Sequence, residues 1–122
     1  MRRSYAVLSL LVASLIFAGT AIASMPKVSS TVNITVPNGS LHYNTKHVTA
    51  KAGLVQINFT NDSKAPHNVS LEHNGEFEYG ASLTIHKGAI VTFLTLAKGT
   101  YHLYSSVGND EDRGMSATLI VR

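Results

Sequence analysis

The chain has 122 residues, with ten basic and seven acidic side chains and six histidines, so its formal net charge is +3. That length suits one domain with a single hydrophobic core. The chain contains no cysteine, which excludes disulfides, thiol catalysis and any thiolate metal ligand.

The first 23 residues have the pattern of a secretory signal peptide. Arg2 and Arg3 form a basic start, residues 6–18 are almost wholly apolar, and Ala21-Ile22-Ala23 matches a cleavage site. We therefore expect a signal peptide over residues 1–23.

Cleavage at this site would leave one domain at residues 24–122, secreted, periplasmic or on the cell surface. No membrane span is then expected. The alternative is an uncleaved N-terminal membrane anchor, because residues 5–23 approach the roughly 20 residues that a spanning helix needs.

Charge gives no sign of a nucleic-acid partner. Loss of Arg2 and Arg3 with the leader leaves eight basic and seven acidic residues, a net charge of +1. The remaining lysines are scattered and form no basic run, so we expect no nucleic-acid binding.

The rest of the chain predicts strands separated by turns. Apolar residues alternate with polar ones, as in Val55, Ile57 and Phe59, and no segment of ten residues keeps a helical period. Turn residues such as Asn74-Gly75 lie between the runs. The predicted strands are Thr31–Val36, Leu54–Thr60, Val69–Leu71, Ala89–Leu96, Tyr101–Ser105 and Ser116–Val121, with a weaker, irregular strand over His42–Tyr43 and His47–Thr49. Such spacing indicates an all-β sandwich or barrel.

Five Asn-x-Ser/Thr sequons follow the leader, more than composition alone would give. They begin at Asn33, Asn38, Asn58, Asn61 and Asn68. One interpretation is an exported, glycosylated protein. The other is that polar strand faces and turns favour these residue types.

Two blocks of sequence contain the candidate site. Residues 55–69 read as a strand that leads into a loop with Pro66-His67-Asn68. Residues 101–115 read as a strand and a loop that closes on Gly114-Met115. In this order and at this separation, the blocks resemble those of the cupredoxins, the blue copper family of plastocyanin and sulfocyanin type, over about residues 31–121.

The resemblance implies a Greek-key β-sandwich or barrel with copper binding and electron transfer as the family activity. It places His67 at the first histidine ligand, Ser105 at the cysteine ligand, Asp110 at the second histidine and Met115 at the axial methionine. Two of these four positions no longer hold the family's ligand.

Two further residues match the family pattern. Asn68 and Ser106 correspond to residues that brace the two ligand loops against each other in the family.

The substitutions exclude a blue, type 1 copper site, because that site requires a thiolate. A carboxylate such as Asp110 suits Cu(II) or Zn(II) better than Cu(I). Two hypotheses therefore stand for the cofactor: copper held weakly in a non-blue site by His67, Asp110 and Met115, or no metal.

Each of these residues also has a structural interpretation. His67 could bridge two loops by hydrogen bonds, and Met115 could fill the core. Ser105 and Ser106 could bond to the backbone at a strand end. Residues 110–112 could form a solvated acidic turn.

We expect an exported, non-enzymatic protein related to blue copper electron carriers, since the sequence carries no nucleophile elbow, zinc-protease or nucleotide-binding motif. The alternative is a metal-free extracellular interaction module. Both place a redox or extracellular protein partner at the loop end around His67, Gly108 and Met115. The oligomeric state stays open.

Overall fold

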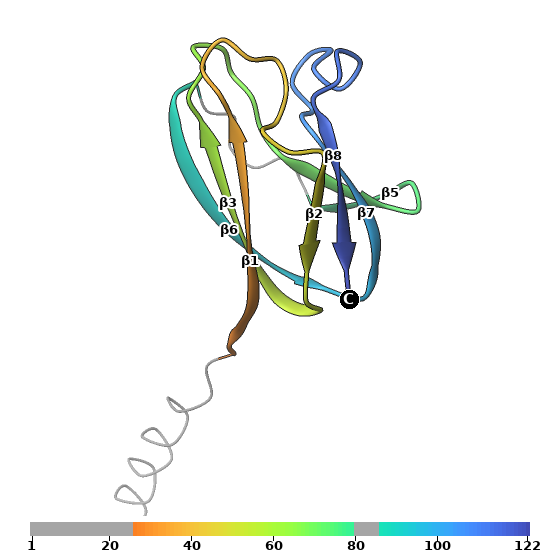
Figure 1. Ribbon diagram of the computed structural model, residues 1–122. Helices are drawn as coiled ribbons and strands as arrows, with labels where there is room; N and C mark the ends of the chain where they lie inside the picture. Colours follow the sequence, from red (N-terminus) through yellow and green to blue (C-terminus); the bar gives the residue numbers. More distant parts are fainter. Residues whose placement is uncertain (1–25, 80–85) are drawn as a thin grey trace, which may run out of the picture.

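The computed structural model describes residues 26–79 and 86–122, which contain eight strands (Figure 1). These are β1 (Val28–Val36), β2 (His47–Ala50), β3 (Gly53–Asn61), β4 (Ser70–His73), β5 (Glu76–Tyr79), β6 (Gly88–Leu96), β7 (Gly99–Tyr104) and β8 (Ser116–Val121). Over these two ranges the chain forms no helix, so the all-β prediction is confirmed. The predicted signal peptide lies outside the described residues. Within them, no helix has the length and apolar character of a membrane span.

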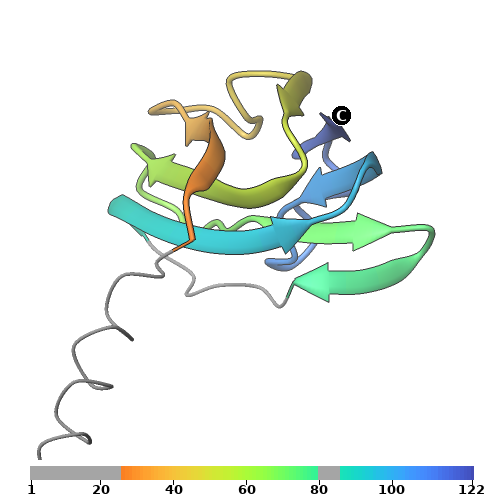
Figure 2. The same ribbon diagram turned by 90° about the horizontal axis from the view of Figure 1, so that it is seen from below.

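The strands form two sheets, which Figures 1 and 2 show from two sides. One sheet has the order β1-β3-β6 and the other the order β2-β8-β7-β4-β5. The β1–β3 and β2–β8 pairs are parallel, and the remaining pairs are antiparallel. Buried residues of both sheets belong to a single cluster, so the fold is a sandwich with one core.

The predicted alternation places the core correctly. On β3, the side chains of Val55, Ile57 and Phe59 are buried, while those between them are half-buried. On the opposite sheet, Leu103 of β7 and Leu119 of β8 are fully buried. This two-residue period is what a sheet needs to cover a core with one face.

Strand β5 was not among the predicted strands. It pairs antiparallel with β4 across a turn at Asn74-Gly75. Both turn residues have positive φ, 53° and 79°, which is the conformation that a two-residue hairpin turn requires and that Asn-Gly adopts readily. The turn was predicted, and the alternation in Glu76–Tyr79 was the signal for its second strand.

The prediction of a strand over His42–Tyr43 is wrong, because residues 41–46 form a loop. The loop folds over the end of β1: Asn44 donates its backbone N–H to Thr35 O (2.7 Å), and Thr35 N–H donates to Asn44 Oδ1 (2.9 Å). The buried hydroxyl of Tyr43 donates to Asn68 O at 2.7 Å. These bonds replace a ladder and fix the loop against the one that contains His67.

Burial separates the five sequons. Asn61 and Asn68 are 0% and 2% exposed and therefore are not glycan acceptors in the folded protein. Asn33 and Asn38 are exposed, and Asn58 is half-buried and donates to Asn33 Oδ1. Glycosylation stays a prediction for these three.

Three loops meet at one end of the sandwich, away from the C-terminus (Figure 1). They are residues 37–46, residues 62–69 and residues 105–115, and we call this region the loop end. The side chain of Lys46 in the first loop donates to Gly114 O in the third at 3.0 Å. The fold therefore brings together the two blocks of sequence that contain the candidate site.

Candidate functional site

At the centre of the loop end, a single carboxylate oxygen joins two other side chains. Nδ1 of His67 lies 2.7 Å from Oδ2 of Asp110, and Oγ of Ser105 donates to the same oxygen at 2.7 Å. His67 is 2% exposed, Asp110 7% and Ser105 1%, so their hydrogen bonds lie out of water. We call His67, Ser105 and Asp110 the central triad.

The triad follows from how the third loop turns. Asp110 N–H donates to Val107 O (3.0 Å) and Met115 N–H donates to Asp110 O (3.0 Å), which folds the loop back on itself. Ser105 N–H then donates to Met115 O at 3.2 Å and closes the loop at its base. The carboxyl of Asp110 is therefore directed inward, while its neighbours Glu111 and Asp112 are exposed.

Asn68 and Ser106 join the second and third loops beside the triad. Asn68 Nδ2 donates to Ser106 Oγ (3.0 Å), and Ser106 N–H donates to Asn68 Oδ1 (2.9 Å). Asn68 is buried and Ser106 is exposed, so this reciprocal pair is partly shielded from water. The bracing contact that the resemblance implied for these two residues is thus present in the geometry.

Tyr43 lies close to the charges of the triad. Burial raises the pKa of the Tyr43 hydroxyl far above its usual range, and the negative charges of Asp110 and Glu111 raise that pKa further. The hydroxyl therefore stays protonated and keeps donating to Asn68 O under ordinary conditions.

The structure brings together all four residues that the resemblance assigns to copper-ligand positions. Asp110 bonds to His67 and Ser105 through its side chain and to Met115 through its backbone. Asp110 is not part of a solvated acidic turn. That description fits Glu111, which pairs with the half-exposed His102 at 2.7 Å.

Two residues expected at a partner surface lie inside the protein. Met115 is 0% and His67 is 2% exposed, so neither presents its side chain to a partner. The large apolar side chain exposed at this end is Leu41, at 44%, and no sequence pattern singled it out. Gly108 is exposed as expected.

The donor set does not fit a type 1 copper ion. The thiolate is absent, and Ser105 uses its hydroxyl proton to bond Asp110. Two ligands of one metal at about 2.0–2.2 Å stand roughly 3 Å or more apart, so the direct 2.7 Å contact leaves no place for an ion between His67 and Asp110. Within residues 26–79 and 86–122, no three His, Asp or Glu side chains are grouped as metal ligands.

The fold is that of the cupredoxins. Three solved structures show the likeness. An auracyanin from Roseiflexus castenholzii matches with a TM-score of 0.68 at 18% identity, over 79% of this chain and 99% of its own. A purple cupredoxin from Nitrosopumilus maritimus gives 0.58 at 22%, over 75% and 99%. Plastocyanin from Dryopteris crassirhizoma gives 0.61 at 17%, over 75% and 100%.

The sequence also matches a protein family. A family model described as PQQ-associated matches residues 8–122, and the chain belongs to that family. No curated protein sequence matches the chain.

Proposed function

We propose that the protein is an exported cupredoxin-fold binding domain that works without copper. The observation that carries this proposal is the contact of 2.7 Å between His67 Nδ1 and Asp110 Oδ2. It pairs Nδ1 of His67 with Oδ2 of Asp110, two atoms that would otherwise be free to bind an ion. With Ser105 bonded to the same oxygen, the triad holds the loops together as the metal does in copper-binding members of the fold.

A domain of this kind acts by binding rather than by electron transfer. The loop end is braced by hydrogen bonds between its loops, and it presents Leu41 and Gly108 fully and Val107 partly to solvent. A rigid surface of this kind suits an extracellular protein partner. The family description points to pyrroloquinoline quinone (PQQ), so we infer that the partner belongs to a PQQ-using system.

A second candidate function is weak, non-blue copper binding. The convergence of His67, Asp110 and the buried Met115 favours it. Copper would then have to break the contact between His67 and Asp110. With a carboxylate in place of the second imidazole and no thiolate, the site would cycle poorly between oxidation states.

Calorimetric titration of the purified protein with Cu(II) separates the two functions. The matched variants are His67→Ala, in the triad, and His47→Ala, an exposed histidine outside it. If the protein works without copper, any Cu(II) binding should be the same in the wild type and in His67→Ala. One-site binding that disappears in His67→Ala and persists in His47→Ala would refute the proposal and establish the copper function.

The partner surface has its own test. Val107→Asp places a charge on a half-buried side chain of the third loop and leaves the three side chains of the triad unchanged. Recovery of a PQQ-dependent protein by the immobilised wild type should fall in this variant and should not change with chelator. Equal recovery by Val107→Asp would exclude the loop end as the contact surface.

A further inference from the structure

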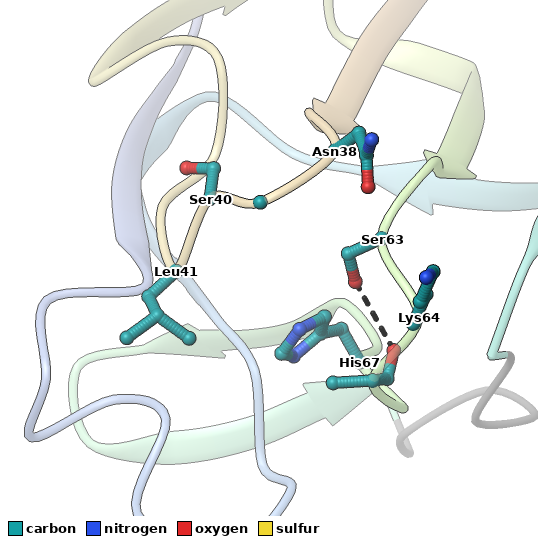
Figure 3. Close-up of a pocket in the computed structure, with 8 residues that line it drawn as sticks. Asn38, Ser40, Leu41, Ser63, Lys64 and His67 are labelled. Atoms are coloured by element: carbon teal, nitrogen blue, oxygen red, sulfur yellow. Dashed lines mark hydrogen bonds between the residues drawn. The ribbon is translucent and has the colours of Figure 1, made fainter.

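A pocket of about 260 Å³ lies beside the triad, between the first and second loops. Figure 3 shows Ser40 and Leu41 on one side and Ser63 and Lys64 on the other, with the ring of His67 between them. Asn38 completes the polar part of the lining. The volume is slightly below the ~300–1,000 Å³ of most ligand sites, which restricts the pocket to a small molecule.

The charge in the pocket lining is positive. Lys64 is the charged side chain of its lining, and no carboxylate is in that lining. Among the described residues Lys64 forms no ion pair, since the pairs found there join His67 to Asp110 and His102 to Glu111. The charge of Lys64 therefore favours an anionic ligand.

His67 adds a requirement for a hydrogen-bond donor. Oδ2 of Asp110 already accepts from Ser105, so Nδ1 of His67 carries a hydrogen and donates to that oxygen. In the neutral ring Nε2 is then an acceptor, and it has no hydrogen-bond partner within the described part of the chain, although it is buried. A buried acceptor without a partner costs free energy that a ligand N–H or O–H would recover.

We propose that this pocket binds a small, flat carboxylic acid that carries an N–H donor next to its carboxylate. The carboxylate pairs with Lys64, the N–H meets Nε2 of His67, and the flat face lies against Leu41. Because Nε2 is enclosed, a side chain of the wall must move aside, and Leu41 is 44% exposed and free to do so. A pyrrole-2-carboxylate has this arrangement, and it forms one edge of PQQ, the molecule in the family description.

The test uses the purified protein with two probes, pyrrole-2-carboxylate and PQQ, and with furan-2-carboxylate as the matched ligand that lacks the N–H. Binding is followed by calorimetry and by the ¹⁵N shift of the His67 ring. We expect saturable binding of pyrrole-2-carboxylate, with furan-2-carboxylate about tenfold weaker because the acceptor stays unpaired.

The protein variants test the charge. Lys64→Gln should weaken pyrrole-2-carboxylate about tenfold, while Lys98→Gln, in the turn between β6 and β7, should change nothing. Saturation by the small acid alone keeps the pocket and removes PQQ as its ligand. Absence of saturation by both probes, equal affinity for the furan acid, or equal effects of the two lysine variants would overturn the proposal. The outcome of these ligand titrations does not depend on the copper titration. The proposed pocket ligand and the proposed copper-free function can therefore fail separately.

Discussion

Nδ1 of His67 lies 2.7 Å from Oδ2 of Asp110, a residue 43 positions further along the chain. This contact joins the loop after β3 to the loop after β7, the two loops whose sequence blocks resemble those of the cupredoxins. Since Ser105 bonds to the same oxygen, one carboxylate satisfies two buried polar groups. The stability of the loop end should therefore depend strongly on Asp110.

Asp110→Ala removes the shared acceptor and leaves the His67 ring and the Ser105 hydroxyl without it. Each buried group left unpaired costs about 1–3 kcal/mol, so the free energy of unfolding should fall by roughly 2–6 kcal/mol. Urea denaturation measures the change. Asp112→Ala removes the same charge from an exposed position two residues away and should cost less than about 0.5 kcal/mol. Similar losses in both variants would mean that the triad does not stabilise the fold.

Asn68 and Ser106 are joined by two hydrogen bonds, one to the Ser106 hydroxyl and one from the Ser106 backbone N–H, and two variants distinguish their contributions to stability. Asn68→Ala loses the bond to Ser106 Oγ and the bond from Ser106 N–H, whereas Ser106→Ala loses only the hydroxyl. We expect a cost of about 1–3 kcal/mol for the first variant and under about 1 kcal/mol for the second. Hydrogen exchange at the Ser106 amide should be faster in Asn68→Ala alone. Equal exchange in the two variants would show that the side chain of Asn68 does not hold the third loop.

The strands and the meeting of the two loops were predictable because they depend on local patterns. The two-residue period of β3 determines which side chains enter the core, and the order of the two blocks determines which loops share an end. The same reasoning identified His67, Ser105, Asp110 and Met115 as neighbours, since each takes a position in a known loop pattern.

What escaped prediction depends on contacts between loops. Nothing in the run Asp110-Glu111-Asp112 distinguishes the first carboxylate, which is buried, from the other two, which are exposed. The direction of each side chain is decided by the turn that Val107 O and Asp110 N–H close. Leu41 was missed for a similar reason, because its loop follows β1 without a periodic pattern and joins the other two loops through the hydrogen bonds of Tyr43 and Lys46.

Tyr43 should make stability depend on alkaline pH. The pKa of tyrosine in an unfolded chain is about 10, and burial raises the pKa of Tyr43 in the folded state well above that. The folded protein therefore keeps the proton after the unfolded chain has begun to lose it. The stabilisation is complete below about pH 10 and is lost progressively as the pH rises further.

Tyr43→Phe should separate this effect from other alkaline titrations. At neutral pH the variant should lose about 1–3 kcal/mol, because Asn68 O loses its donor. Between about pH 9 and 11 its free energy of unfolding should fall less steeply than that of the wild type. Parallel pH profiles for the two proteins would show that Tyr43 does not contribute to the alkaline loss.

Ser105→Cys combined with Asp110→His should restore a blue copper site if the loops hold the ligand positions in place. The double variant supplies a thiolate and a second imidazole beside His67 and Met115, the set that a type 1 site requires. With Cu(II) it should develop the intense visible absorption of a copper–thiolate bond. Asp110→His alone lacks the thiolate and should stay pale, and His67→Ala in the double variant should abolish the band. A folded double variant without a blue band would mean that Ser105 does not occupy the position of the lost cysteine, and the copper-based alignment of the third loop would have to be abandoned.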